Sequence, residues 1–288
     1  MSSDFPSHGR RARGRADRGA TAPGGRLAGL DTSVAHPARV YDYWLGGKDN
    51  FAADREAAER VLAVAPGLRF RVRANRTFLG RVTRFLAGEA GIRQFLDIGT
   101  GIPSADNTHE VAQRAAPKAR VVYVDNDPVV LLHAQALLRS SPEGATEYVQ
   151  ADLRDPGLIL ERAAGLLDFG QPVAVMLIAV LHLIQDSEDP WGIVARLMDA
   201  VPPGSYLAIS HPALDVHHAQ PTIQKVYNAN VSTPQTLRTR DEVARFFTGL
   251  DLVEPGLVQV HQWRPDPDDF APEGVFSNHG AVGRKPGA

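Results

Sequence analysis

Three carboxylates stand at the ends of three apolar segments of the chain, and a glycine pair lies beside the first of them. Asp97 precedes Gly99 and Gly101, Asp125 follows Gly101 by 24 residues, and Asp152 comes after the third apolar segment. Two glycines separated by one residue let the backbone turn tightly and approach a ligand, because no Cβ intervenes. A carboxylate at the position of Asp125 can accept both hydroxyls of a ribose. Each residue alone is typical of an ordinary turn, but together they predict a nucleotide-type ligand site.

Two classes of ligand fit this pattern to different degrees. A dinucleotide fingerprint has a third glycine where this chain has Ser104, and Pro103 lacks an amide hydrogen that would help to hold a pyrophosphate. Asp106, near the start of the next predicted helix, would repel a phosphate. A cofactor without phosphate therefore fits better. S-Adenosylmethionine carries a sulfonium and an ammonium besides its adenosyl group, so a site lined by acids suits it, and a nicotinamide dinucleotide is the alternative.

The elements that must position these residues alternate along the chain. Apolar runs rich in Val, Ile, Leu and Tyr predict strands over residues 94–98, 120–124, 146–150, 173–181 and 205–210. Helical patterns between them predict helices over about 104–116, 127–139, 157–166 and 190–200. Asp127 and Pro128 give one of these helices a clear start. Such alternation predicts a doubly wound α/β domain with a parallel sheet, in which ligands bind at the carboxyl ends of the strands.

Residues on either side of this domain follow other patterns. Residues 36–88 predict helices, with segments at 51–62 and 69–86 separated by Pro66-Gly67. After the last parallel strand, the sequence predicts a loop over 211–219, helices over 221–231 and from Thr239 to Phe247, and two short strands at 257–260 and 280–284. The expected division is a tail over 1–30, a helical extension or lid over 31–90, and a Rossmann-like domain over 91–288.

Composition excludes several classes of function. The 288 residues are 43% hydrophobic and contain no cysteine, which removes thiolate nucleophiles and cysteine-bound metals. The longest apolar run, residues 173–181, is far shorter than the about 20 residues of a membrane span. Residues 1–30 carry a charge of +4 and the rest of the chain −6, so the first part is expected to be a disordered arm. Nucleic acid is an unfavoured partner, and a cytoplasmic protein is expected.

The motifs resemble those of class I S-adenosylmethionine-dependent methyltransferases. The strings concerned are 96–101, 124–125, 151–153, and Leu181-His182 followed by Asp189-Pro190. A narrower resemblance, over residues 33–286, is to the S-adenosyl methyltransferase family once described only as a domain of unknown function, and it rests on residues 38–51, 73–79, 97–103 and 124–128. Pro103 departs from the general class I pattern but agrees with the narrower family. The resemblance implies a Rossmann-like sheet, S-adenosyl-L-methionine as cofactor and S-adenosyl-L-homocysteine as product.

The pattern and the resemblance together give a set of expected cofactor residues. They are Asp97, Gly99, Thr100, Gly101, Asp125, Asn126, Asp152, Leu153, Tyr41, Asn75 and Arg76. Asn75 with Arg76 or Arg73 is expected to hold the methionine carboxylate, since arginine presents a planar fork to such a group. Tyr41 belongs with Tyr43 and Trp44 to an expected aromatic wall, because aromatic faces attract desolvated cations. Packing of the extension onto the sheet accounts for these aromatic residues nearly as well.

His182 and His211 are the candidate catalytic residues. Both fall at carboxyl ends of predicted strands, where a histidine can act as a general base near neutral pH. A polar residue at the wall of a cleft is the alternative reading of each. His211, His217 and His218 with Asp215 also suggest a metal site, but the spacing lacks a His-Glu-x-x-His pattern, and no metal is expected.

Residues and motifs that are absent from the sequence restrict the possible methyl acceptors. Without cysteine, the covalent route to carbon 5 of pyrimidines is closed, and no Asp/Asn/Ser-Pro-Pro-aromatic string indicates methylation of exocyclic base amines. The acidic body disfavours long polyanionic substrates. An O or N atom of a small molecule is therefore the expected acceptor. A non-catalytic sensor of the cofactor and a nicotinamide-dependent oxidoreductase are the alternatives.

Overall fold

The computed structural model describes residues 31–137, 140–267, 269 and 278–287, so the predicted tail over 1–30 lies outside it. Within these ranges the chain from Thr32 onward forms one compact unit. Its sheet has the order β3-β2-β1-β4-β5-β8-β6, with β7 paired to β8. The strands are β1 Gln94–Ile98, β2 Arg120–Asp125, β3 Ala145–Gln150, β4 Ala174–Ile178, β5 Tyr206–His211, β6 Asp251–Leu252, β7 Val258–Gln259 and β8 His279–Arg284.

Strands β1 to β5 are parallel, and β8 runs antiparallel to β5. Strand order reverses between β1 and β4, which makes the carboxyl end of β1 the switch point where open α/β sheets bind ligands. The predicted doubly wound α/β class is confirmed, with a central sheet of mostly parallel strands.

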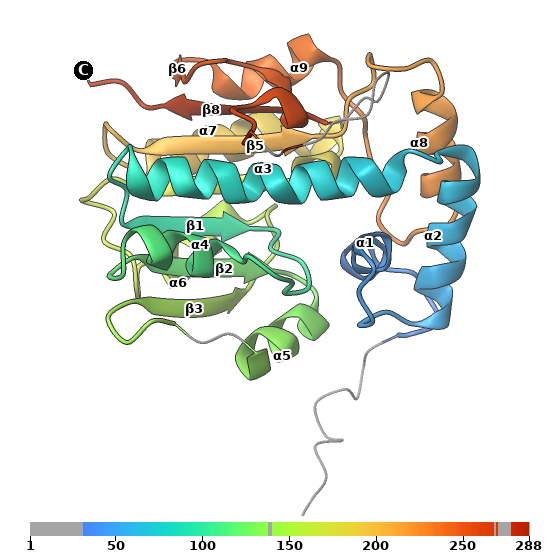
Figure 1. Ribbon diagram of the computed structural model, residues 1–288, viewed down its shortest axis with the longest axis horizontal. Coiled ribbons are helices and arrows are strands. Elements are labelled where there is room, and N and C mark those ends of the chain that lie inside the picture. Colours follow the sequence, from blue (N-terminus) through green and yellow to red (C-terminus); the bar gives the residue numbers. More distant parts are fainter. Residues whose placement is uncertain (1–30, 138–139, 268, 270–277, 288) are drawn as a thin grey trace, which may run out of the picture. The chain divides into compact units, whose positions relative to one another are not determined.

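Helices cover both faces of the sheet. The helices of this part are α4 Thr108–Ala115, α5 Pro128–Leu137, α6 Pro156–Ala163, α7 Pro190–Asp199 and α9 Arg240–Ala244. Side chains alternate along β1, so Leu96 and Ile98 pack in one core with residues of α6 and α7, and Phe95 packs in the other with α4 and the helix α3 Leu68–Gly88. Figure 1 shows α3 crossing one face of the sheet while α7 lies behind it.

A third core joins the N-terminal helices to a late segment of the chain. It contains residues of α1 Pro37–Leu45, α2 Ala52–Val64, the start of α3, and α8 Gln220–Asn228. Trp44 packs near Tyr227 there, with ring centroids 6.3 Å apart. Figure 1 shows α1, α2 and α8 beyond the carboxyl ends of the parallel strands. The predicted N-terminal helices are therefore present, and they border the edge of the sheet where a ligand is expected.

Two predicted elements are shorter in the structure, and both errors fall at the ligand edge. The helix expected from residue 104 begins at Thr108, because Asp106 has a φ of 58° and Glu110 accepts the backbone N–H of Asn107 at 2.8 Å. The strand expected over 173–181 ends at Ile178, because Ala179 has a φ of 54° and turns the chain into a 3₁₀ turn at Leu181–Leu183. Apolar composition alone did not reveal these turns.

The other predicted elements are present with shifted ends. Thr239 caps α9, accepting the N–H of Glu242 at 3.3 Å, and a 3₁₀ turn continues to Phe247 as predicted. The predicted end of the helix at residues 138–139 lies outside the described part. The strand β6 was not predicted, because two residues carry no detectable periodicity. None of the described helices is long and apolar enough to cross a membrane.

Candidate functional site

The turn after β1 is built around two glycines in the left-handed region. Gly99 has a φ of 75° and Gly101 a φ of 67°. A Cβ on Gly99 would lie 2.3 Å from Cγ2 of Val180, whereas a Cβ on Gly101 would meet nothing within 4 Å. Thr100 and Gly101 line a cavity at this edge of the sheet. The turn thus needs Gly99 for close packing and keeps the backbone at Gly101 open to a ligand.

Asp125 lies at the end of β2, directly opposite this turn. Its Oδ2 accepts the N–H of Gly101 at 2.8 Å, and its Oδ1 accepts the N–H of Asp127 at 2.9 Å. Burial raises the pKa of Asp125, and the two backbone hydrogen bonds oppose that rise. Each carboxylate oxygen has a second lone pair, so both can still accept from a ligand. The structure places Asp125 in the same cavity as the glycine turn.

Asp97 is buried at the end of β1, with 4% of its surface exposed. Thr108 donates its hydroxyl to Oδ2 at 2.6 Å. Burial raises the pKa of Asp97 to about 6, against the lowering effects of the Thr108 hydrogen bond and the Arg76 cation. Arg76 donates to the carbonyl of Ala105 and to Oδ1 of Asn107, each at 3.0 Å, and lines the cavity with Asp97. The cavity therefore brings the Arg76 guanidinium together with the buried Asp97 and the glycine turn.

Asp152 differs from the other two acids in being ion-paired. Arg154 donates to its Oδ1 at 3.1 Å, and Asn126 donates to its Oδ2 at 3.0 Å. Burial raises the pKa of Asp152, but the hydrogen bonds from Arg154 and Asn126 outweigh this effect and lower it. Leu153 is 5% exposed. All four residues line the cavity, so the end of β3 contributes one apolar wall and an ionised, charge-compensated carboxylate.

A chain of hydrogen bonds connects α1, α3 and β5 behind the cavity wall. Ser210 donates to Oδ1 of Asn75, Asn75 donates to the Tyr41 hydroxyl at 2.9 Å, and Tyr41 donates to the carbonyl of Val72 at 3.2 Å. Tyr41 and Asn75 line the cavity, as predicted. Arg73, the alternative carboxylate holder, is exposed and is not part of the lining.

The expected aromatic wall is present only in part. Tyr41 and Trp44 line the cavity, and Trp44 donates its indole N–H to the carbonyl of Ala58 at 3.2 Å. Tyr43 is outside the lining, because its hydroxyl donates to Glu59 at 2.5 Å and its ring lies under the guanidinium of Arg69. The helical spacing of α1 explains this split, since neighbouring side chains point in different directions.

His182 and His211 have different environments. His182 lines the cavity, and its buried Nδ1 has no hydrogen bond within the described ranges. Burial, with a contribution from Arg238, lowers the pKa of His182 to about 3. His211 is fully buried and is not part of the lining. Its Nε2 accepts from Arg238 at 2.8 Å, so Nδ1 carries the hydrogen that is donated to the carbonyl of Pro212 at 2.8 Å.

Both hydrogen-bonding atoms of the His211 ring are thus used inside the protein. Burial lowers the pKa of His211 well below its ordinary value, and the neighbouring His182 and Arg238 add smaller effects in the same direction. The two rings meet edge to face with centroids 6.0 Å apart. The structure therefore brings His182, and not His211, to the cavity.

Arg238 lies behind the cavity lining and is a positioning residue that the sequence did not reveal. Its side chain is 1% exposed and donates to the carbonyls of Leu181 and Ile184, at 3.0 and 2.8 Å. It also pairs with Asp186 at 2.7 Å. These bonds hold the segment after β4 that carries His182. A single arginine in a polar segment gave no signal in the sequence that it would be buried.

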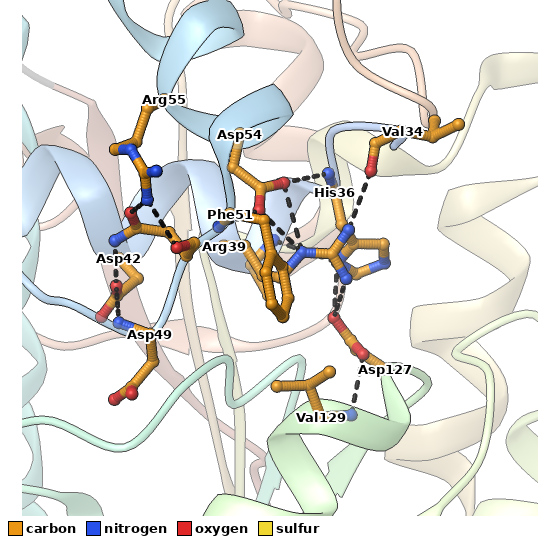
Figure 2. A network of polar contacts seen from close by, with 12 residues as sticks. Val34, His36, Arg39, Asp42, Asp49, Phe51, Asp54, Arg55, Asp127 and Val129 are labelled. Carbon is orange, nitrogen blue, oxygen red and sulfur yellow. Dashed lines mark hydrogen bonds and ion pairs between the residues drawn. The ribbon is translucent and has the colours of Figure 1, made fainter. Parts of the chain in front are cut away.

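A second missed feature is a network of polar contacts between the extension and the start of α5, which Figure 2 shows. Arg39 pairs with Asp54 at 3.0 Å and contacts Asp127 at 3.5 Å, and Nδ1 of His36 lies 2.9 Å from Oδ2 of Asp127. Asp127 also accepts the N–H of Val129 at 2.9 Å, consistent with its predicted capping role. The capping pattern marked Asp127, but nothing local marked its partners on α1 and α2.

The histidines of the loop over 211–219 do not assemble with acids into a metal site. His217 and His218 stack with ring centroids 4.1 Å apart, and Asp215 instead pairs with His279 at 2.8 Å. Among the residues that the structure describes, no three or more His, Asp and Glu side chains are arranged to hold a metal ion.

Comparison with known proteins shows the family of the chain. The profile of a family described as S-adenosyl methyltransferase matches residues 24–286. A solved DUF574 family protein from Streptomyces avermitilis MA-4680 is 48% identical, with a TM-score of 0.85, and the match covers 89% of this chain and 99% of that one. A solved structure from Thermobifida fusca YX is 44% identical, with a TM-score of 0.81 and coverage of 90% and 97%. None of the curated proteins matches the chain. With nearly the whole described chain matched at this identity, the protein belongs to the S-adenosyl methyltransferase family.

Proposed function

We propose that this protein transfers a methyl group from S-adenosylmethionine to an O or N atom of a small molecule. One observation carries the proposal. Residues of the apolar core between α1, α3 and α8 line the same cavity as the glycine turn and Asp125. A methyl donor at the turn and an acceptor among these helices would share one cavity.

The residues at the turn suit the cofactor by their chemistry. Asp125 supplies two carboxylate oxygens for ribose hydroxyls, and Asp97 supplies an anion for the ammonium group. Arg76 supplies a cation for the methionine carboxylate. The open space above Gly101 admits a ligand to the backbone. Asn126, Asp152 and Leu153 form the wall for the adenine, with the apolar side chain of Leu153 against the ring.

The acceptor compartment is walled mainly by apolar and aromatic side chains. Its apolar and aromatic lining residues are Tyr41, Trp44, Leu45, Val61, Leu68, Val72, Ile223, Tyr227 and Leu237, and the polar side chains of Asp42, Arg71 and Gln220 also line it. A small, largely apolar acceptor with one nucleophilic O–H or N–H group is the substrate class that these walls fit.

When bound, the cofactor supplies an electrophilic methyl group. The protein must hold the nucleophile in line with the bond between sulfur and the methyl carbon and shield it from water. His182 is the candidate group at the acceptor. Its low pKa keeps the ring neutral near pH 7. Because Nδ1 is buried, Nε2 is the ring nitrogen that can accept the hydrogen of an acceptor O–H or N–H and orient its lone pair. Arg238 holds the backbone on which His182 lies.

The test uses S-adenosylmethionine with an isotopically labelled methyl group and a low-mass metabolite extract. Wild-type protein is expected to move the label into a new small molecule. Ile223→Trp, which fills the acceptor compartment, is expected to abolish this transfer while S-adenosylhomocysteine still binds with wild-type affinity. Binding without transfer to any fraction would favour the sensor, and binding of NADH in place of the adenosyl ligand would favour the oxidoreductase.

The extension is proposed to take part in closing this space. Residues 36–50 are expected to gain protection from hydrogen exchange when S-adenosylhomocysteine is added. Protection confined to the glycine turn and the Asp125 region would instead make the extension a fixed scaffold.

A further inference from the structure

His36 lies at the beginning of α1 and lines the cavity that contains the glycine turn and Asp125. Its side chain is 25% exposed, whereas its partner Asp127 is 1% exposed. The imidazole therefore belongs both to a buried polar network, which Figure 2 shows, and to the lining of the cavity.

The orientation of this ring is fixed by three contacts. Nδ1 lies 2.9 Å from Oδ2 of Asp127, the backbone N–H of His36 donates to Asp54 at 2.9 Å, and the N–H of Ala38 approaches Nδ1 at 3.4 Å. Nε2 lies on the opposite side of the imidazole and makes no hydrogen bond to the residues that the structure describes. With Nδ1 committed to the network, Nε2 is the polar atom that His36 presents to the cavity.

His36 and Asp125 are connected through one residue. Asp127 receives the His36 ring on its carboxylate and donates its own backbone N–H to Oδ1 of Asp125 at 2.9 Å. The His36 ring also lowers the pKa of Asp125 against the effect of burial, so the two side chains are close enough to interact electrostatically. Asp125 is the carboxylate assigned above to the ribose, and His36 lies beside it.

We propose that His36 is a cofactor-binding residue, whose Nε2 hydrogen-bonds a ribose hydroxyl of the adenosyl group while Nδ1 remains on Asp127. A hydroxyl both donates and accepts, so it can pair with a carboxylate oxygen and an imidazole nitrogen at once. This inference rests on the cofactor site of the proposed function. It makes the N-cap residue of α1 part of that site and connects α1 to the ligand.

The decisive variant is His36→Asn. The amide nitrogen of asparagine stands where Nδ1 stands and can donate to Asp127, and asparagine is a favourable helix N-cap, but it has no atom at the position of Nε2. We expect the melting temperature without ligand to stay near the wild-type value. Titration calorimetry with S-adenosylhomocysteine should show binding weakened about 3- to 10-fold, as for one lost hydrogen bond. His36→Ala should weaken binding equally and also lower the melting temperature.

Deoxyribose analogues of S-adenosylhomocysteine identify the contact. Wild-type protein should lose affinity for the 2′-deoxy or the 3′-deoxy analogue, and His36→Asn should show a smaller loss for one of the two. Equal losses in both proteins for both analogues would overturn the ribose contact, and wild-type affinity of His36→Asn for S-adenosylhomocysteine would overturn the role of His36 altogether.

Two controls separate this result from other failures. Asp49 lies 3.7 Å from His133, and this surface pair also connects the extension to α5. Asp49→Asn removes the pair and should change neither the melting temperature nor the affinity for S-adenosylhomocysteine. Asp125→Ala tests the site itself. Weak binding by Asp125→Ala with normal binding by His36→Asn refutes only the role of His36, whereas normal binding by both refutes the proposed cofactor site.

Discussion

The backbone amide of Gly101 donates to Oδ2 of Asp125 across 2.8 Å, which joins the turn after β1 to the end of β2. This bond is formed by the protein alone, so the turn and the carboxylate already have a fixed relative position. A preformed site loses less conformational entropy when it binds. The affinity for the cofactor should therefore depend strongly on these two residues.

Asp125→Ala should weaken the binding of S-adenosylhomocysteine by about 10- to 100-fold, because it removes charge-assisted hydrogen bonds to the ribose. Titration calorimetry measures the change. Circular dichroism spectra should match those of the wild type, which would assign the loss to the site. Unchanged affinity would contradict the assignment of Asp125.

Asp97→Asn should change how stability depends on pH. The pKa of Asp97 is about 6 in the folded protein, above its ordinary value of 3.8, so the folded state binds this proton more tightly. Ionisation of Asp97 therefore costs stability, and the cost develops as pH rises from about 4 to about 6, reaching about 3 kcal/mol. The asparagine variant lacks this cost.

Denaturant unfolding of both proteins at several pH values tests this prediction. His182 and His211 have lowered pKa values and destabilise the fold as pH falls, and Asp125 also titrates, but these groups are present in both proteins. The difference between the two curves should therefore grow between pH 4 and 6 and stay constant above it. A difference that does not vary with pH would mean that Asp97 has an ordinary pKa.

Gly99→Ala and Gly101→Ala form a matched pair. Both place a Cβ on left-handed backbone, which costs roughly 1–2 kcal/mol. Only the Cβ of residue 99 collides with Val180, so Gly99→Ala should lose substantially more stability in denaturant unfolding. The Cβ of residue 101 points into open cavity and should instead weaken cofactor binding. Equal stabilities would show that Val180 moves aside without cost.

Arg238→Ala should destabilise the protein by about 2–4 kcal/mol, because it leaves the carbonyls of Leu181 and Ile184 and Nε2 of His211 without their donor. Thermal unfolding measures the effect. Arg114→Ala is the comparison, since Arg114 pairs with Asp106 on the surface with both side chains 63% exposed, and exposed pairs contribute little. Similar effects of the two substitutions would contradict the structural role of Arg238.

Much of the fold follows from local sequence. The strands of the parallel sheet are short apolar runs, and helices carry capping residues such as Asp127 at α5 and Thr239 at α9, so these elements are specified by neighbours in the chain. The glycine turn and the acids at 97, 125 and 152 were also predictable, because strand ends in a parallel sheet necessarily meet at one edge. Errors arose where single residues with positive φ, Asp106 and Ala179, ended elements early.

Only the tertiary structure decided which histidine, which arginine and which aromatic residues face the cavity. His182 and His211 look equivalent in the sequence, but Arg238, 27 residues beyond His211, occupies the Nε2 of His211 alone. His36 lines the cavity near Asp125 because Asp127, 91 residues away in the sequence, contacts its ring. Such roles depend on contacts between segments that are far apart in the sequence. Neither a periodic pattern nor a local motif in the sequence indicates which distant segments will form such a contact.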